Sequence, residues 1–533
     1  MTAAPPSAVG TRGARRLATD SATVSAWTLV SRVLGLVRVV IIGAALGPTF
    51  FANTFQAGYT VPNLVFTVIA GPVLAMVAVP AVVRSLGADG QEGARLFLAR
   101  LAGALLAASG LLAAAVVLAS PLIAWSLTVG IPEAAGRARA QDLTLLLVVL
   151  VAPQVVLYTI AGLAVAAQQA RGRFALAAAA PAVENVVVIA AVVAAAGLYG
   201  QGLEADHVPV AMVVLLGLGS TLGVAVHAGL QLFGTARAGL LVGPRRGGRV
   251  DPEVRSATAR ILRSVPVAAC PAAATYLLLV AAGTVPGGVF VVQLAVTVFY
   301  ALSYLGPRAV AMAVLPGLAT SAHAGDRASF AAGWRRGLTY AVVTGLLPLV
   351  LLGILAGPTA EQLALGSVAT GPVVTALTLC LAVVAVAQLA GGLHDIGRQA
   401  LYARADDAGP RRAAMAALGG VAAGAAGALA VADGPVRLAL LLGALLLGEL
   451  VAGAVVLRRL HRWLGDEPLM ELGGIRRALL AALAALPVAL AGRFLLDLAP
   501  ENRVTTLAVL LAVGSAALAV YALTVRLLPG GRQ

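Results

Sequence analysis

The chain has few charged residues and no lysine. Charged side chains make up 11% of its 533 residues, and all 37 basic residues are arginine. Soluble domains carry about 25% charged residues. Hydrophobic residues make up 60% of the chain, and the mean hydropathy is +0.96. A soluble fold of this length cannot hide so much apolar surface from water. The composition therefore argues against a soluble enzyme and predicts an all-α polytopic membrane protein.

Cysteine is scarce, and the sequence patterns of several enzyme classes are missing. The two cysteines, Cys270 and Cys380, lie in apolar segments without metal-ligand spacing, so we expect packing residues rather than a metal site. The sequence has no G-x-x-x-x-G-K-[ST] loop, no HExxH and no Ser/His/Asp grouping. We predict no enzymatic activity and no cofactor. The polar segment 1–19 has no apolar core followed by a cleavage site, so we expect no cleaved signal peptide.

Long apolar segments repeat from one end of the chain to the other. About 20 mainly apolar residues are needed to span a bilayer, and the sequence predicts 14 such spans. The second, eighth and tenth are long enough to tilt or break. The predicted spans are 23–46, 55–83, 96–121, 143–167, 174–199, 208–235, 258–284, 288–318, 337–357, 370–397, 412–432, 436–457, 475–496 and 505–527.

The arginines are distributed unevenly between the two sides of these spans. With the N-terminus inside, 29 arginines fall in inside segments, five in outside loops and three within spans. Such a bias fixes orientation by the positive-inside rule, and it predicts that both termini are cytoplasmic. Because topology explains the basic charge, we expect no nucleic-acid partner.

Two short segments recur at similar offsets. Residues 79–84 resemble residues 315–320 at an offset of 236, and residues 170–174 resemble residues 403–407 at an offset of 233. Parallel repeats of this kind are a known plan of transporters. We predict a tail (1–22), an N-lobe of six spans (23–236), a basic loop (237–257), a C-lobe of six spans (258–460) and two additional spans with a short tail (461–533).

Several short motifs follow one another along the first 410 residues. They are SRVLGLVR (31–38), ANTF (52–55), PNL (62–64), QARGRFAL (169–176) with Pro181 and Asn185, Tyr300-Ala301, Leu315-Pro316 and LYARAD (401–406) with Pro410. In this order they resemble the motifs of the MurJ/MviN family of lipid II flippases, part of the multidrug/oligosaccharidyl-lipid/polysaccharide exporter superfamily. The resemblance implies a membrane flippase in the bacterial cell (plasma) membrane, acting in peptidoglycan synthesis on a lipid-linked anionic substrate. It also allows cell-wall synthesis proteins as partners.

The chain lacks several charged residues of the family pattern. Asn53 stands in place of an acidic residue, and uncharged residues occupy further charged positions, at Phe66, Thr67, Gly71 and Ser303. Two alternatives to the flippase therefore stay open. One is a cation-coupled exporter of small molecules, and the other is a membrane scaffold without transport activity.

The arginines within the spans are the principal candidates for substrate binding. Arg32 and Arg38 lie about 9 Å apart along a helix axis, and guanidinium groups bind phosphate oxygens in bidentate fashion. The alternative for Arg32 is a structural ion pair with Asp20. Arg308 follows Pro307 and is a candidate replacement for the arginine missing at Ser303.

Uncharged and acidic residues within spans complete the set of candidates. Asn53 and Asn63 are expected either to face the substrate or to bond neighbouring helices. Glu184 and Glu449 are candidates for ion coupling, since a carboxylate within a span normally faces a cavity or a partner. The alternative is a buried strut between helices. His227 fits better as a hydrogen-bonded interior residue, and His394, Asp395 and Arg398 fit better as an interfacial cluster.

Overall fold

The protein is entirely helical over the residues that the structure describes. The structure is a computed structural model, and it describes residues 9–69, 71–248, 250–431, 434–498 and 502–528. Within these ranges it contains one short 3₁₀ turn, η1 (Gly366–Val368), and 18 α-helices: α1 (Val9–Leu46), α2 (Phe50–Ile69), α3 (Gly71–Ala88), α4 (Gly90–Leu118), α5 (Ser120–Thr128), α6 (Ala134–Val151), α7 (Gln154–Ala170), α8 (Ala175–Tyr199), α9 (Val210–Arg237), α10 (Pro252–Ala282), α11 (Gly288–Leu305), α12 (Pro307–His323), α13 (Arg327–Leu363), α14 (Gly371–Ala403), α15 (Ala408–Leu429), α16 (Pro435–Leu464), α17 (Leu472–Leu498) and α18 (Arg503–Leu527).

These helices confirm the all-α membrane architecture. Thirteen helical stretches of the described chain are long and apolar enough to span a membrane, and each overlaps one predicted span. The second predicted span, 55–83, corresponds instead to the two shorter helices α2 and α3. The eighth span is interrupted between α11 and α12 at Gly306. The tenth is the single helix α14.

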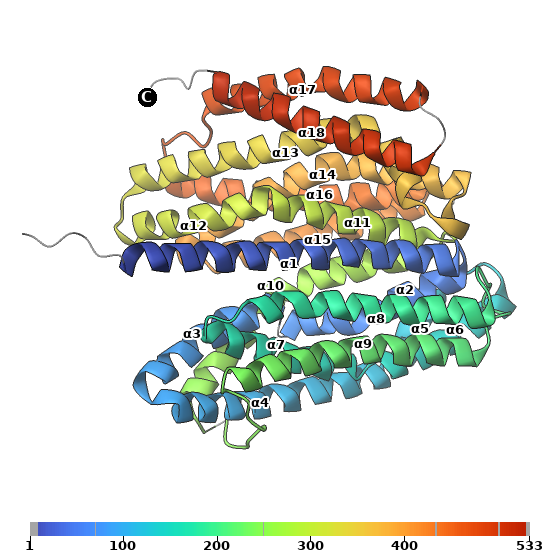
Figure 1. Cartoon of the computed structure of the whole chain (residues 1–533), viewed down its shortest axis with the longest axis horizontal. Helices are drawn as coiled ribbons and strands as arrows, with labels where there is room; N and C mark the ends of the chain where they lie inside the picture. Colours follow the sequence, from blue (N-terminus) through green and yellow to red (C-terminus); the bar gives the residue numbers. More distant parts are fainter. Residues whose placement is uncertain (1–8, 70, 249, 432–433, 499–501, 529–533) are drawn as a thin grey trace, which may run out of the picture.

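The helices form two bundles, with α1 between them (Figure 1). Helices α2–α9 lie on one side of α1, and α11–α16 lie on the other side. Helices α17 and α18 pack on the outer surface of α13, where Tyr521 of α18 donates a hydrogen bond to the carbonyl of Val343 at 2.7 Å. We call the bundle of α2–α9 together with α1 the N-lobe and the bundle of α11–α16 the C-lobe; the predicted bounds of the lobes stay a prediction.

Helix α10 contacts both lobes. Its first part packs into the N-lobe core beside Leu98 and Leu101 of α4, through Val254, Ala257 and Ile261. Its last part belongs to a core shared with C-lobe helices, through Leu278, Leu279 and Ala282. Pro266 and Pro271 lie between these two parts.

The segment between α9 and α10 lies against the N-lobe. The backbone N–H of Arg245 donates to the carbonyl of Ala99 in α4 at 2.8 Å. At the start of α10, Arg100 donates to the Asp251 carboxylate at 2.7 Å, and the other carboxylate oxygen accepts from the backbone N–H of Glu253 and Val254. The Asp251 carboxylate therefore has two roles: it holds the linker against α4, and it caps the N-terminus of α10.

Small residues let α15 and α16 approach closely. A Cβ atom added at Gly448 of α16 would lie 2.7 Å from a methyl carbon of Val421 and 2.9 Å from the Ala417 carbonyl oxygen, both in α15. Membrane helices associate largely through such close packing, because lipid provides no hydrophobic driving force between them.

We expect Gly448→Leu to destabilise the C-lobe, because the side chain would force α15 and α16 apart. Overpacking of this kind costs roughly 1–3 kcal/mol. Thermal unfolding in detergent measures the effect. Gly443→Leu is the matched control on the same helix, since a Cβ at Gly443 meets nothing within 4 Å. Equal loss of stability in the two variants would contradict this packing.

We expect the contact between Arg100 and Asp251, which holds the linker, to weaken at low pH. Burial of Asp251 opposes its ionisation, but hydrogen bonds from Arg100 and from two backbone N–H groups outweigh burial and hold its pKa below the usual value. A lowered pKa adds stability above the unfolded pKa of about 3.9, and this stability disappears as the pH falls through the folded pKa. Asp251→Asn should therefore lower the unfolding temperature at pH 7, and this effect should decrease as the pH falls below about 3.9. Glu253→Gln is the control, because the Glu253 contact with Arg84 is longer, at 3.5 Å, and more exposed.

Candidate functional site

Two of the arginines predicted to bind substrate, one from each lobe, stack on the same tyrosine ring. The guanidinium carbon of Arg32, in α1, lies 3.9 Å from the ring centroid of Tyr304 in α11. That of Arg308, in α12, lies 4.5 Å from the same centroid. Among the residues described, neither arginine has a carboxylate partner. We call these three residues the Tyr304 cluster. Stacking on an aromatic face holds the cations in place and leaves their N–H groups free to bind an anion.

The alternative partner proposed for Arg32 falls outside the structure's description. The side chain of Asp20 is not among the described residues. The position of Arg32 over Tyr304 is, however, defined, and it directs the guanidinium toward the second lobe.

Arg38 occupies a different environment from Arg32. It donates a hydrogen bond to the hydroxyl of Tyr59, in α2, at 2.9 Å. Its Nε atom is buried and has no hydrogen-bond partner. The two arginines of α1 are therefore not in one cluster: Arg32 faces the C-lobe, whereas Arg38 faces the interior of the N-lobe.

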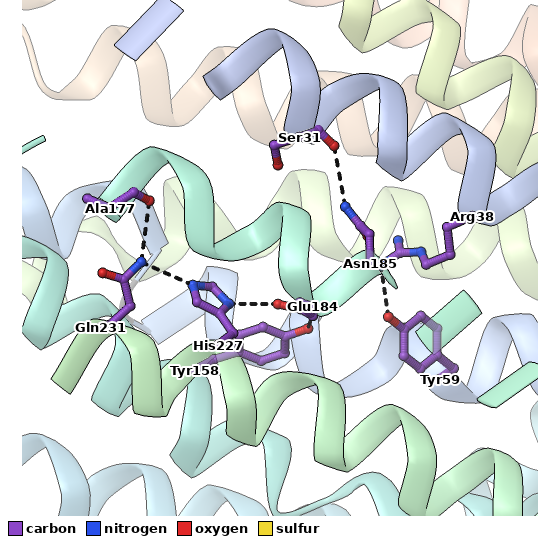
Figure 2. A network of polar contacts seen from close by, with 9 residues as sticks. All are labelled: Ser31, Arg38, Tyr59, Tyr158, Ala177, Glu184, Asn185, His227 and Gln231. Atoms are coloured by element: carbon purple, nitrogen blue, oxygen red, sulfur yellow. Dashed lines mark hydrogen bonds and ion pairs between the residues drawn. The ribbon is translucent and has the colours of Figure 1, made fainter. Parts of the chain in front are cut away.

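Glu184 is the centre of a buried hydrogen-bond network in the N-lobe (Figure 2). One carboxylate oxygen accepts from the Tyr158 hydroxyl at 2.8 Å, and the other lies 2.6 Å from Nδ1 of His227. Tyr158 is on α7, Glu184 on α8 and His227 on α9. The interior position expected for His227 is confirmed, and its partner is the carboxylate predicted for ion coupling.

The network continues from His227 through two glutamines. Gln231, one turn along α9, places Nε2 3.4 Å from Nε2 of His227. Gln168, on α7, donates to Oε1 of Gln231 at 2.7 Å. We call Tyr158, Glu184, His227, Gln231 and Gln168 the Glu184 network.

Asn185 connects α8 to α1. Its Nδ2 donates to the carbonyl of Ser31 at 3.3 Å, and Figure 2 shows it beside Arg38. A Cβ atom added at Gly35 of α1 would lie 3.8 Å from Nδ2, an ordinary van der Waals contact, so the amide packs directly against this turn of α1. Asn185 therefore acts as a strut that fixes α1 on the rest of the N-lobe.

Asn53 joins the two lobes rather than facing open space. Its Nδ2 donates to the carbonyl of Val285 at 2.7 Å, and its Oδ1 accepts from the backbone N–H of Val289 at 3.0 Å. Both amide atoms are used in this conformation, so contact of Asn53 with a substrate stays a prediction. Asn63 is exposed, one residue after Pro62 in α2, and its predicted contact with a substrate is likewise untested.

Glu449 forms the corresponding pair in the C-lobe. Its carboxylate lies 2.7 Å from Nδ1 of His394 in α14. The Nε2 atom of His394 is buried without a partner. One turn away, Arg398 donates to Asp395, so the C-lobe pair has an ion pair as its neighbour.

A surface pocket of about 460 Å³ lies where α7, α8 and α9 meet the start of α1. Its lining includes two arginines, two phenylalanines and the network residue Gln168. The arginines are Arg173 and Arg237, and the phenylalanines are Phe174 and Phe233. The pocket places the end of the Glu184 network next to solvent.

Sequence reasoning missed the tyrosines. Tyr304, Tyr59 and Tyr158 each bind or stack on a candidate residue of another helix. Because aromatic residues make up only 5% of the chain, a tyrosine near a charged residue within a span is uncommon. That pattern was the signal that could have identified these tyrosines. Over the described residues, the structure contains no group of three or more His, Cys, Asp or Glu that could hold a metal ion.

Comparison with known proteins identifies the family. The family described as "Lipid II flippase MurJ" matches residues 42–498. A probable lipid II flippase MurJ of Rhizobium tropici is 30% identical over 170 residues, which cover 32% of this chain and 31% of that protein. A second, from Rhizobium meliloti (strain 1021), is 29% identical over 258 residues, 48% of this chain and 44% of that protein. The chain thus aligns with less than half the length of these relatives.

Solved structures show the same fold. A lipid II flippase MurJ in an inward closed conformation superposes with a TM-score of 0.71 at 15% identity, over 94% of this chain and 97% of that one. An inward-facing multidrug resistance MATE family transporter superposes with a TM-score of 0.61 at 14% identity, over 81% and 94%. Because the family match extends over most of the sequence, this chain belongs to the MurJ lipid II flippase family.

Proposed function

We propose that the chain moves a lipid-linked cell-wall precursor similar to lipid II from the inner to the outer leaflet of the bacterial cell membrane by alternating access. Membership of the MurJ family supports this function. The structural observation that carries it is the Tyr304 cluster, in which the two lobes each contribute one unpaired cation.

The cluster fits the diphosphate of such a substrate. Each guanidinium binds phosphate oxygens in bidentate fashion, and a diphosphate is long enough to contact both Arg32 and Arg308. A ligand held by both lobes is sensitive to their relative position, because rocking of one lobe separates the two cations. The polyprenyl tail stays in the surrounding lipid, and the sugar-bearing head crosses between the lobes.

Alternating access requires a contact that breaks at one end of the molecule. The Asn53 amide holds the lobes together beside Val285 and Val289, and Gln293 adds a hydrogen bond to Thr60 at 3.1 Å. With both termini in the cytoplasm, as the arginine distribution predicts, this end faces outward. The structure then corresponds to a state closed toward the outside.

The remaining candidates fit secondary roles in this cycle. Asn63 is a candidate for contacting the head group, and Arg38 is a candidate for supporting its charge from the N-lobe. Glu184 and Glu449 are the candidates for ion coupling. Cell-wall synthesis proteins are the partners that a precursor flippase would meet. The alternative, a cation-coupled exporter, has support only from the fold that MATE transporters share.

We expect Arg32→Gln with Arg308→Gln to abolish flipping without loss of the protein from the membrane. Hydrogen bonds to charged groups contribute about 1.5–3 kcal/mol each, so each single substitution should lower transport by roughly 10- to 150-fold. The measurement is mass spectrometry of polyprenyl-linked lipids in cells depleted of the native protein, together with a leaflet-accessibility probe.

Two controls make this test specific. Arg493→Gln removes an exposed arginine, paired with Asp497 on α17, and should leave flipping intact. Tyr304→Phe keeps the ring and should also retain activity, whereas Tyr304→Leu should not. Full activity of the double arginine variant would refute the assignment. Accumulation of a different lipid-linked glycan would change the substrate and keep the mechanism.

We expect Asn53→Leu to shift the protein toward the state open at the Asn53 end. The substitution leaves the buried backbone N–H of Val289 without a partner, at a cost of roughly 1–3 kcal/mol, and removes one of the two hydrogen bonds to the Val285 carbonyl, which keeps the bond from the backbone N–H of Gly288 at 2.8 Å. Spin labels at Tyr199 and Val436, with both native cysteines replaced by Ala, report the distance between α8 and α16 at this end. A longer distance is expected, and an unchanged distribution would contradict the role of Asn53.

A further inference from the structure

The Glu184 network contains an ionisable pair that the substrate contacts do not use. Glu184 and His227 are both buried, with side chains only 8% and 11% exposed, and are 2.6 Å apart. An ionisable group within a span costs at least about 2.5 kcal/mol and generally marks a functional position. The pair connects α8 to α9, and Tyr158 extends it to α7.

The hydrogen bonds of the glutamines define the protonation state of His227. Gln168 donates to Oε1 of Gln231 at 2.7 Å, so the Nε2 group of Gln231 is the one that faces His227. An amide N–H₂ can only donate. Nε2 of the imidazole is therefore the acceptor, and Nδ1 carries the proton that is donated to Glu184. In this arrangement the imidazole is neutral and the carboxylate is charged.

The neutral imidazole has a position for one more proton. The contact between Gln231 and Nε2 of His227 is long, at 3.4 Å, and Nε2 of Gln231 also faces the Ala177 carbonyl at 3.3 Å. Replacing so weak a hydrogen bond costs little. After protonation, the imidazolium and the carboxylate form a buried ion pair, and rotation of the Gln231 amide would offer its oxygen to the new N–H.

The end of the Glu184 network that is farthest from the carboxylate lies at the surface pocket. Gln168 lines the pocket and is two hydrogen bonds from the imidazole. Gly234, a further lining residue, lies only seven positions beyond His227 on α9. By the predicted topology, this pocket opens on the cytoplasmic side.

One cation and two tyrosines are the other ionisable groups around the carboxylate. Arg38 approaches from α1 and Tyr59 from α2, and these two are hydrogen-bonded to each other. Tyr158 approaches from α7. The charges of Arg38 and Glu184 interact. The pair therefore sets the negative charge that Arg38 experiences within the N-lobe.

We propose that Glu184 and His227 form a proton-binding site whose occupancy is linked, through Arg38, to the binding of the anionic head group. This inference rests on the proposed function. Without the extra proton the pair carries one negative charge, which opposes an incoming diphosphate and competes for Arg38. With the extra proton the pair is neutral, and the diphosphate binds more strongly. By reciprocity, the diphosphate increases the proton affinity of the pair.

The test is calorimetry of ligand binding to the full-length protein in lipid nanodiscs. The probe is farnesyl diphosphate, measured near pH 7 in two buffers of different ionisation enthalpy. We expect the native protein to take up part of one proton as it binds, and its Kd to fall by up to about tenfold per unit decrease in pH. His227→Asn and Glu184→Gln should bind the probe with less proton uptake and a flatter pH dependence.

His207→Asn is the matched control. His207 is also beside a carboxylate, 3.0 Å from Asp206, but both side chains are exposed. Because the probe itself can bind protons, the comparison is between proteins at the same pH. Equal proton uptake by the native protein, His227→Asn and His207→Asn would overturn the inference and leave the proposed function intact.

A second measurement keeps the two proposals separate. If no protein binds the diphosphate, the proposed function fails, and ligand-free infrared difference spectra between pH 5.5 and pH 8 decide the proton site. An imidazole signal that is lost in His227→Asn but kept in His207→Asn supports the site. An identical signal in the native protein and His227→Asn refutes it. His227→Gln serves in either experiment should the asparagine variant fail to fold.

Discussion

The absence of water in the hydrocarbon region constrains every part of this structure. Backbone groups must find partners within the chain, so the spans are helical. Polar side chains must do the same, and most of those in the core bond a neighbouring helix. Asn185 and Gln388 each donate to a backbone carbonyl of another helix, and Asn53 donates to the carbonyl of Val285, between α10 and α11. Arg32 and Arg308 differ from these residues, because both stack on Tyr304 and neither is paired with a carboxylate of the described residues, and they are for that reason the best candidates for binding a ligand.

The internal repeat determines where the lobes meet. Asn53 bonds the backbone of Val289, which lies 236 residues later, and 236 is also the offset between the segments at residues 79 and 315. Asn53 therefore contacts the residue at its own position in the second repeat. The starts of α2 and α11 thus come together where a two-fold relation between the lobes would place them.

The sequence predicted the architecture better than the site. Hydropathy located thirteen of the spans, because apolar length is a local property. The second span was long enough to tilt or break, and it is divided into α2 and α3, but the position of the break could not be predicted because apolar character continues across it. Site partners could not be predicted, since they depend on how each helix is rotated. Arg32 and Tyr304 are 272 positions apart, and the contact exists only because α1 lies beside α11.

The division of α10 between the lobes has a mechanical consequence. Its first turns are fixed to α4 by Arg100 and by the core that includes Ile261, whereas its last turns pack among C-lobe helices. Any rocking of one lobe against the other must therefore bend this helix. Pro266 and Pro271 remove two backbone donors from the stretch between the fixed ends, which lowers the bending stiffness there. Helix α10 is thus the part of the molecule that bends. Its resistance to bending, rather than the length of the preceding linker, limits how far the lobes can rotate against each other.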